Sequence, residues 1–212
     1  MKIYLDSCDV DIIKKYTILG IIDGVTTNPS ILAKEKEKSN AILKNICDIT
    51  QSSVSVEVMS EKAEDMINEA YQLLDISPYI TIKLPITEDG LYACRKLSSE
   101  SISVNMTLCF SASQALFAAK AGATYVSPFI GRLDDMGCNG LNLIEDICAI
   151  YSNYPNITTQ ILAASIRNIM HVNHVLKMGV DVITVPAKLI PLMITNPLTE
   201  QGINIFKKDW YK

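Results

Sequence analysis

The sequence lacks the features that mark membrane, zinc-binding, disulfide-rich and nucleic-acid-binding proteins. No apolar run approaches the roughly 20 residues of a membrane span, although 49% of the 212 residues are hydrophobic. The six cysteines are scattered without a C-x-x-C pair, so neither a zinc site nor a disulfide framework is indicated. The net charge is −4 and the basic residues form no stripe, which argues against nucleic acid as a partner.

Targeting signals and histidines are also scarce. The first residues run directly into a strand pattern, which leaves no room for a signal peptide, so we expect a cytoplasmic protein with reduced thiols. The two histidines, His171 and His174, fall in an expected helix away from the expected site. Their H-x-x-H spacing favours a solvated helix face over a metal site. The alternating charges of residues 34–38 also predict a solvated face. We expect no metal and no organic cofactor.

Short apolar runs recur along the whole chain at about the spacing of βα units. Between them lie helical patterns, such as residues 63–74, 112–120 and 168–178. Ser111 is the expected N-cap of the second pattern, and Gly122 and Gly179 are expected helix stops. The strands are expected at residues 3–5, 24–27, 54–58, 80–84, 103–108, 125–129, 160–164 and 181–185.

This alternation predicts an α/β fold, a (β/α)8 TIM barrel, with residues 1–212 as a single domain. An open doubly wound sheet is the competitor, but no glycine-rich phosphate loop follows the first strand. One more helix is expected after the eighth unit, at about residues 199–210, and it carries the only tryptophan. That helix could cap its own barrel or dock onto a neighbouring subunit.

A lysine stands in the middle of an apolar strand pattern. Lys83 lies within residues 79–86, YITIKLPI. Lysine is almost never fully buried without compensation, and desolvation favours its neutral amine. A neutral amine facing a carbonyl substrate forms a Schiff base, which serves as an electron sink. The alternative is an ammonium group in solvent at a strand end or paired with a carboxylate.

Further polar residues fall at the expected carboxyl ends of the strands, where such barrels place their catalytic groups. Singly, each has a structural alternative. Asp6, Asn28 and Ser165 could cap helices. Glu57 and Lys83, on adjacent strands, could form a structural ion pair. A barrel interior is normally filled by branched apolar side chains, so the whole set favours a site. The set is Asp6, Thr26, Thr27, Asn28, Glu57, Lys83, Asn105, Thr107, Ser127, Arg132, Ser165 and Arg167.

These residue types indicate Schiff-base chemistry on a phosphorylated ketose. Lys83 would form the imine, and Asp6 would take the C4 hydroxyl proton as the bond between C3 and C4 breaks. Glu57 would polarise a water that moves protons during imine formation. The side chains expected to orient hydroxyl groups and that water are Asn28, Asn105 and Thr107. The side chains expected to clamp a phosphate dianion are Arg132, Arg167 and Ser165, the last at a helix N-terminus.

Seven ordered motifs also carry a family resemblance. They are LDS at 5–7, GVTTNPS at 24–30, VEV at 56–58, IKLP at 82–85, NMT at 105–107, SPFIGR at 127–132 and ASIRN at 164–168. Together they resemble the transaldolase family, most closely its short, single-domain branch, which also contains fructose-6-phosphate aldolase. The resemblance covers essentially the whole chain.

The resemblance implies transfer of a dihydroxyacetone unit from sedoheptulose 7-phosphate to glyceraldehyde 3-phosphate, in the non-oxidative pentose phosphate pathway. The products would be erythrose 4-phosphate and fructose 6-phosphate. It implies Lys83 as the Schiff-base lysine, Asp6 as the acid/base and Glu57 as the carboxylate that activates water. It also implies a homo-oligomer, a decamer of two pentamers, with the C-terminal helix reaching a neighbour. The remaining implied roles are the water contact of Thr107, dihydroxyacetone binding by Asn28, Asn105 and Ser127, and phosphate binding by Arg132, Ser165 and Arg167.

Two positions separate the activities of this branch. The aldolases carry glutamine where this chain has Glu57, and tyrosine where it has Phe129. A tyrosine hydroxyl would protonate the carbanion, whereas phenylalanine leaves it intact until an aldehyde arrives. We therefore expect a transaldolase, with fructose-6-phosphate aldolase as the main alternative. A phosphosugar-binding protein without turnover is a further alternative.

Overall fold

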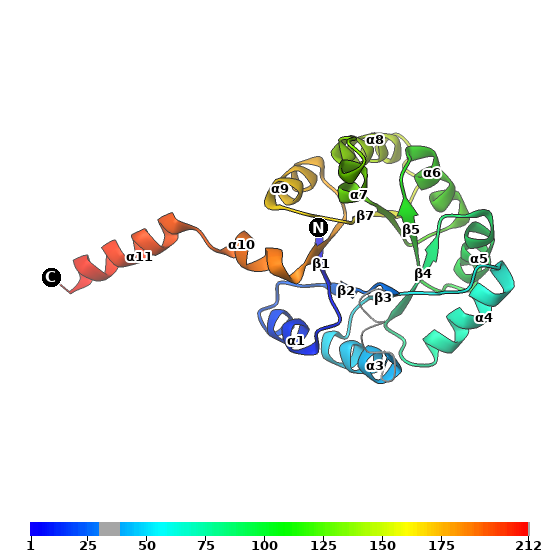
Figure 1. The fold of residues 1–212 in the computed structure, drawn as a ribbon, viewed down its shortest axis with the longest axis horizontal. Coiled ribbons are helices and arrows are strands. Elements are labelled where there is room, and N and C mark those ends of the chain that lie inside the picture. Colours follow the sequence, from blue (N-terminus) through cyan, green and yellow to red (C-terminus); the bar gives the residue numbers. More distant parts are fainter. Residues whose placement is uncertain (30–38, 212) are drawn as a thin grey trace.

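The computed structural model describes residues 1–29 and 39–211. Eight parallel strands close into a barrel in sequence order, and β8 pairs with β1. Figure 1 shows the helices arranged around the outside of this barrel. The strands are β1 (Lys2–Asp6), β2 (Gly24–Thr26), β3 (Val54–Glu57), β4 (Ile80–Pro85), β5 (Val104–Cys109), β6 (Tyr125–Pro128), β7 (Gln160–Ala163) and β8 (Val182–Pro186). The predicted (β/α)8 barrel is therefore confirmed.

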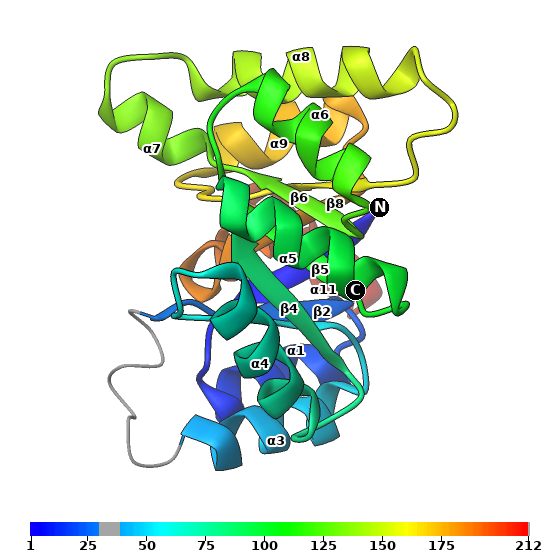
Figure 2. The ribbon, with the colours of Figure 1, turned by 90° about the vertical axis from the view of Figure 1, so that its right-hand side faces the viewer.

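In the described residues, α1 to α9 lie in the connections between strands, whereas η2, α10 and α11 follow β8. In Figure 2, α7 lies on the side of the barrel opposite the N-terminus, where the strands have their carboxyl ends. The helices are α1 (Val10–Ile18), α3 (Ser39–Thr50), α4 (Ala63–Leu74), α5 (Glu88–Ser99), α6 (Ala112–Ala121), α7 (Ile130–Asp135), α8 (Gly140–Ser152), α9 (Ile169–Met178), α10 (Ile190–Ile194) and α11 (Pro197–Trp210), with the 3-10 turn η2 (Ala187–Leu189) before α10.

Several helix ends follow the local sequence chemistry. The Ser111 hydroxyl accepts a hydrogen bond from the backbone N–H of Gln114 and so caps α6, as predicted. Gly122 ends that helix at a φ of 87°, a conformation that glycine adopts without steric cost. Asp9 caps α1, which rules out the alternative in which Asp6 serves as that cap. The helix expected after Asn28 and the charges at 34–38 fall on residues outside the described part.

The apolar core lies between the strands and the surrounding helices. Buried side chains such as Leu5, Val25, Ile82 and Val126 belong to it, and all four are fully buried. Because successive side chains of a strand point to opposite faces, their sequence neighbours point into the barrel. The outward-facing side chains of the strands, the outer layer, thus supply most of the hydrophobic stabilisation. The inward-facing side chains, the inner layer, can therefore be of other residue types.

Much of the barrel interior is polar, although a separate buried cluster of Tyr4, Tyr125, Leu162, Ala164 and Val182 also lies there. The hydroxyls of Thr26 on β2 and Thr184 on β8 lie 2.6 Å apart, although β1 stands between these two strands. The amide of Asn105 on β5 reaches the Ser55 hydroxyl on β3 at 3.2 Å, across β4. Contacts between strands that are not neighbours are made inside the barrel. Sequence reasoning expected branched apolar filling there, except at the carboxyl ends of the strands.

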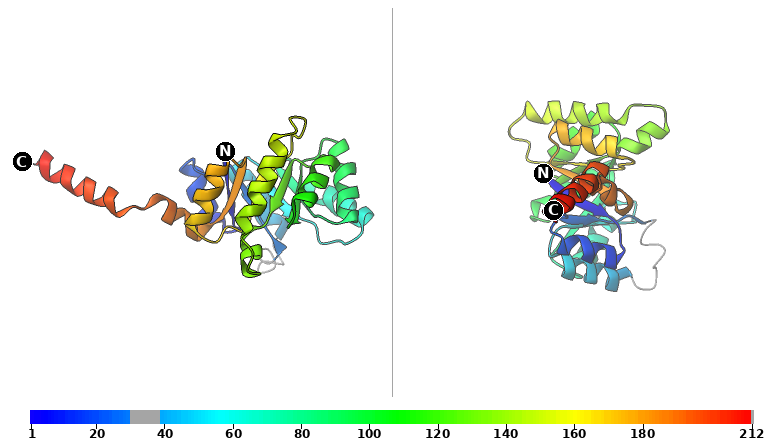
Figure 3. Two further views of the ribbon diagram at one scale, coloured as in Figure 1. Left: turned by 90° about the horizontal axis from the view of Figure 1, so that it is seen from above. Right: turned by 90° about the vertical axis from the view of Figure 1, so that its left-hand side faces the viewer.

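The C-terminal helix α11 extends away from the barrel (Figures 1 and 3). None of its residues is buried, and Phe206 and Trp210 are 75% and 84% exposed. The alternative in which this helix caps its own barrel is therefore wrong. Its exposed apolar side chains also include Leu198, Ile203 and Ile205.

Candidate active site

A cavity of about 600 Å³ opens at the carboxyl ends of the strands. Most of the predicted site residues meet there, because these strand ends converge on one mouth of the barrel. Thr27, Asn105 and Thr107 do not line this cavity and are fully buried. The predicted residues that line the cavity are Asp6, Thr26, Asn28, Glu57, Lys83, Ser127, Phe129, Arg132, Ser165 and Arg167.

Lys83 is buried at the inner end of the cavity and is compensated in two ways. Its Nζ lies 3.2 Å from Glu57 Oε2, and the two side chains are only 8% and 15% exposed. Nζ also donates a hydrogen bond of 3.1 Å to the carbonyl oxygen of Thr27. The strand register pairs Glu57 with Lys83, which explains why the two side chains meet. The ion pair considered from sequence is therefore present, and it lies inside the cavity.

Asp6 ends β1 and faces the same cavity. Thr26 donates a hydrogen bond of 3.1 Å to Asp6 Oδ1. Burial raises the pKa of the Asp6 carboxyl, while the charge of Lys83 and hydrogen bonds from Thr26 and Asn28 act in the opposite direction. A carboxyl group with a raised pKa near an amine is suited to accept and return a proton.

Asn105, which lies beside Lys83 in the sheet, is hydrogen-bonded to Ser127 and to Ser55. Ser127 donates to Asn105 Oδ1 at 2.7 Å, and Asn105 Nδ2 donates to Ser55 at 3.2 Å. The register places Asn105 directly beside Lys83. Thr107 Oγ1 is buried and has no hydrogen-bond partner among the described residues. An orphaned buried hydroxyl of this kind is costly unless a bound water or ligand group satisfies it.

An aromatic pair and an arginine form one side of the cavity rim. The rings of Phe110 and Phe129 meet edge to face, with their centroids 5.7 Å apart. The guanidinium carbon of Arg132 lies 4.9 Å from the centroid of the Phe129 ring, which is a cation–π arrangement. These contacts fix the Phe129 ring and place a positive charge beside it.

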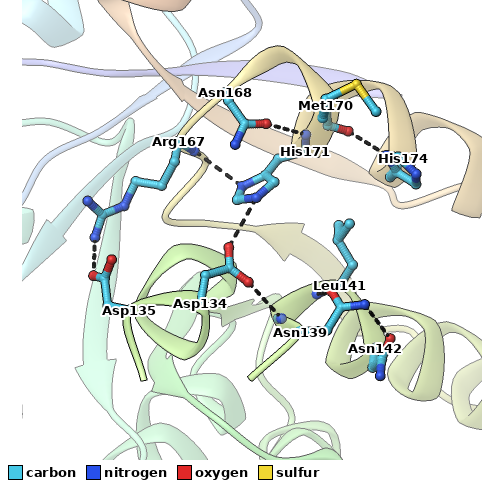
Figure 4. A network of polar contacts seen from close by, with 11 residues as sticks. Asp134, Asp135, Asn139, Leu141, Asn142, Arg167, Asn168, Met170, His171 and His174 are labelled. Atoms are coloured by element: carbon cyan, nitrogen blue, oxygen red, sulfur yellow. Dashed lines mark hydrogen bonds and ion pairs between the residues drawn. The ribbon is translucent and has the colours of Figure 1, made fainter. Parts of the chain in front are cut away.

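The second arginine is held by a carboxylate on the opposing segment. Figure 4 shows Arg167 reaching Asp135 at the end of α7, with Nη2 and Oδ2 2.8 Å apart. The buried ring of His171 accepts a hydrogen bond from the Arg167 backbone N–H at Nδ1, 3.4 Å away. Its Nε2 lies 3.0 Å from Asp134 Oδ2. This network ties the loop before α9 to α7.

His171 corrects the sequence interpretation. Both histidines were expected on a solvated face, but His171 is only 8% exposed and contacts Asp134. His174 is only partly buried and contacts its own helix at the carbonyl of Met170. Neither histidine lines the cavity. No group of three or more histidine, cysteine, aspartate or glutamate side chains in the described part of the chain could hold a metal ion.

Ser165 lies four residues before the first residue of α9, Ile169, the helix that it was expected to cap. Asn168 caps α9 by accepting a hydrogen bond from His171 N, so Ser165 is not the N-cap. Ser165 instead adopts a φ of 58°, in the left-handed region. Leu108, which also lines the cavity, has a φ of 57°. Such conformations are uncommon outside glycine and cluster at functional sites.

Gly131 permits the close approach of α7 and the loop that carries Ser165 and Arg167. A Cβ at this position would lie 2.5 Å from the side chain of Arg167 and from the carbonyl oxygen of Ser165. The Gly131 N–H also donates to that carbonyl at 3.0 Å. Glycine therefore allows the first turn of α7 to pack directly against the loop that carries Arg167.

Two polar residues of the cavity, Thr184 and Lys188, were missed by sequence reasoning. Thr184 on β8 lines the cavity and contacts Thr26. Sequence reasoning placed Thr26 at the site but gave it no specific role. Lys188, an exposed residue of η2, adds a third cation to Arg132 and Arg167 around the cavity. Thr184 sits in an apolar strand pattern, where threonine is a common strand former, so its type gave no signal. Lys188 lies two residues after the end of β8 at Pro186. A charged residue just beyond a strand end was the sequence feature that could have predicted it as a site residue.

The arrangement can perform proton transfer and nucleophilic chemistry on an anionic substrate. A buried amine and two carboxylates lie at the inner end, and three cations lie around the opening. An amine of this kind can add to a carbonyl group, and the carboxylates can move the protons that the addition and its reversal require. The described residues also contain no helix that could cross a membrane.

Comparison with known proteins gives consistent relatives over the full length. A sequence model of the transaldolase/fructose-6-phosphate aldolase family matches residues 3–212. The chain is 50% identical to a "probable transaldolase" of Paracoccus denitrificans, over 100% of this chain and 97% of that protein. A protein of Thermodesulfovibrio yellowstonii with the same description is 51% identical, over 100% of this chain and 99% of its own length.

A solved structure supports the fold alone. The thiamine phosphate pyrophosphorylase of Pyrococcus furiosus superimposes with a TM-score of 0.59 and 19% sequence identity. The match covers 88% of this chain and 85% of that one. At this identity the likeness concerns the barrel and not the chemistry of its mouth.

Proposed function

Because the chain belongs to the transaldolase/fructose-6-phosphate aldolase family, we propose that it is a transaldolase working through Lys83. It would transfer a dihydroxyacetone unit from sedoheptulose 7-phosphate to glyceraldehyde 3-phosphate. The products are erythrose 4-phosphate and fructose 6-phosphate, as in the non-oxidative pentose phosphate pathway. The observation that carries the proposal is the buried Lys83 amine, 3.2 Å from Glu57, in a cavity that Asp6 also lines.

The first half of the reaction breaks the donor ketose. Lys83 attacks the C2 carbonyl, and water leaves to give a protonated imine. Glu57, in contact with Lys83, moves the protons for that loss through a water molecule. The buried Thr107 hydroxyl supports a binding place for such a water. Asp6 then takes the C4 hydroxyl proton, the electrons of the C3–C4 bond move to the imine nitrogen, and the first aldehyde leaves.

The second half builds the new ketose. The enamine carbon attacks the acceptor aldehyde, Asp6 returns its proton to the new C4 oxygen, and water releases the product from Lys83. Asn28 and Ser127, which line the cavity, would bind the dihydroxyacetone part, with Asn105 orienting Ser127. The residues proposed to bind the phosphate are Arg132, Ser165 and Arg167.

Two residues favour transfer over cleavage. Phe129 carries no hydroxyl, and its ring is fixed between Phe110 and Arg132. No proton donor is therefore supplied at this point to quench the carbanion before the acceptor arrives. Glu57 is a carboxylate that can take and return protons, whereas an amide could not.

We also propose a cytoplasmic homo-oligomer in which α11 contacts a neighbouring copy. The exposed apolar side chains of α11 support this, because monomeric proteins rarely expose contiguous apolar patches. The family resemblance suggests a decamer of two pentamers. Light scattering of the purified protein measures its assembly size directly.

The test of the function is a coupled assay with fructose 6-phosphate, with and without erythrose 4-phosphate. We expect glyceraldehyde 3-phosphate release only with the acceptor, and none from Lys83→Met. Release without acceptor would identify an aldolase instead.

Borohydride trapping with fructose 6-phosphate distinguishes an enzyme from a binding protein. We expect a covalent adduct on the wild type and none on Lys83→Met. Lys188→Met is the matched control, because it removes another lysine of the same cavity and must keep the adduct. A protein that only binds phosphosugars forms no adduct.

A further inference from the structure

A chain of two hydroxyl groups leads from β8 to the carboxylate of Asp6. Thr184 Oγ1 lies 2.6 Å from Thr26 Oγ1, and Thr26 Oγ1 donates to Asp6 Oδ1 at 3.1 Å. Thr26 and Thr184 are 3% and 5% exposed, and both line the cavity. Thr184 has no hydrogen bond to Asp6 in the described structure, so any influence that it has on the carboxylate passes through Thr26.

The direction of the chain follows from the number of protons. A threonine hydroxyl has one hydrogen to donate and two lone pairs to accept with. Because Thr26 gives its hydrogen to Asp6, it accepts in the contact with Thr184, and Thr184 is the donor. The 2.6 Å separation lies at the short end of the range for O–H···O hydrogen bonds. Each bond in such a chain polarises and strengthens the next one.

We propose that Thr26 and Thr184 are positioning residues for Asp6, which hold Oδ1 and leave Oδ2 as the oxygen that exchanges a proton with the substrate. This inference rests on the proposed function, in which Asp6 is the acid/base. It concerns residues that are neither among the polar partners of Lys83, which are Thr27 and Glu57, nor part of the proposed phosphate clamp. Thr184 acts at one remove, through the Thr26 hydroxyl.

The geometry gives the pair two effects. The first is orientation, because a carboxylate with one oxygen fixed cannot rotate freely about its χ2 angle. The second is on proton affinity. Hydrogen bonds donated to a carboxylate favour its ionised form, whereas burial favours the neutral form. The threonine pair thus keeps a buried carboxylate ionised and ready to accept the C4 hydroxyl proton.

Other charged groups act on Asp6 from the surrounding elements. Lys83 on β4 lowers the pKa of Asp6, and Asn28 donates a hydrogen bond to it. Glu57 on β3 and Lys188 in η2 line the same cavity. The arginines of the rim are Arg132 on α7 and Arg167 before α9. None of these groups is altered by a substitution at Thr184, which makes that position the clean probe of the hydroxyl chain.

The experiment measures the pH dependence of kcat for acceptor-dependent transfer from fructose 6-phosphate. Thr184→Val keeps the shape of the side chain and removes its hydroxyl. We expect the acid limb of the profile to move up by about half a pH unit, and by about one unit in Thr26→Val, which loses the charge-assisted bond directly. KM should stay within about twofold, because neither residue is placed in the phosphate clamp. Thr184→Ser should restore the wild-type profile.

Non-additivity is the decisive readout. If Thr184 acts through Thr26, the double variant matches Thr26→Val alone in both kcat and the acid limb. A structural role would instead lower the urea midpoint without moving the acid limb. Losses that multiply in the double variant, or an unmoved acid limb in Thr184→Val, overturn the inference. If Thr184→Val does not fold, an unmoved acid limb in Thr26→Val overturns it equally.

The controls separate this inference from the proposed function. Asp6→Asn and Lys83→Met test the function, and both should abolish transfer. If they do and Thr184→Val leaves the profile unchanged, the threonine chain is wrong and the transaldolase stands. If Asp6→Asn retains full transfer, the assignment of Asp6 as acid/base fails first.

Discussion

The contact between Lys83 and Glu57 leads to a stability prediction for Lys83→Met. This substitution keeps most of the side-chain volume but removes the buried positive charge. The carboxylates of Glu57 and Asp6 then line the cavity without a neighbouring Lys83 charge. Removing one partner of a buried ion pair is destabilising because the remaining charge loses its compensation. We therefore expect the variant to be folded but less stable than the wild type.

The structure sets the size of the effect. Two unit charges at the observed 3.2 Å attract by about 5 kcal/mol at an effective dielectric constant of 20. Both side chains retain some exposure to the open cavity, at 8% and 15%, so solvent screens part of this. We expect a loss of about 2–3 kcal/mol in the free energy of unfolding. With a urea slope of about 3 kcal/mol/M, the midpoint falls by about 1 M.

The loss should depend on pH through Asp6. Burial already raises the pKa of Asp6 in the folded state, and Lys83 opposes that rise. Without Lys83 the folded pKa rises further above the unfolded value. A group of this kind favours the folded state most below its unfolded pKa, and its contribution is lost as pH rises through the folded pKa. The deficit of Lys83→Met should therefore be larger at pH 8 than at pH 5.

The assay is urea denaturation of Lys83→Met, Glu57→Gln and the double variant at one protein concentration, since an oligomer's stability depends on it. Lys188→Met is the control, because this exposed lysine should change stability by less than about 0.5 kcal/mol. The double variant should be more stable than the two single losses predict when added. Equal midpoints for Lys83→Met and the wild type at pH 8, or strictly additive losses, would refute the reasoning.

Three further predictions follow from the rim and from α11. Phe129→Tyr should raise cleavage of fructose 6-phosphate to free dihydroxyacetone by roughly tenfold or more, since a placed proton donor accelerates protonation; an unchanged rate without acceptor contradicts this. Asp135→Asn should free Arg167 for the phosphate and lower KM about two- to fivefold, as expected for an exposed ion pair; an unchanged KM shows that Asp135 does not compete. Replacing Phe206 and Trp210 together by glutamate should shift light scattering to smaller species, and an unchanged mass would place the interface elsewhere.

The strands were predictable because the outer face of each carries a continuous apolar pattern. The observed β4 begins where expected and ends one residue later, and the observed β5 is shifted by one residue at both ends. The catalytic candidates Lys83 and Glu57 stood out because charged residues interrupted those patterns. For the strands and for these two residues alike, the local pattern of apolar and charged residues indicated which side chains are buried.

Other features depend on contacts between distant segments, which local patterns do not encode. His171 is buried because α7 brings Asp134 to it from 37 positions earlier in the chain (171 − 134). Thr184 meets Thr26 inside the barrel, across β1, at a sequence separation of 158. The left-handed backbone of Leu108 falls on a residue type that gives no sign of it. These parts of the site required the folded geometry.

The polar side chains inside the barrel separate two roles, stabilising the fold and binding the substrate, that many folds assign to the same residues. Most hydrophobic burial occurs outside the strands, in the layer that holds residues such as Leu5 and Ile82. The inner hydroxyls and amides, such as Ser55 and Asn105, contribute little to that layer. Substitutions of the neutral side chains inside the barrel, outside the Lys83–Glu57 pair, can therefore reshape substrate choice while the outer apolar layer maintains the fold. For enzyme engineering, this makes the inner layer the place to build libraries and the outer layer the part to keep constant.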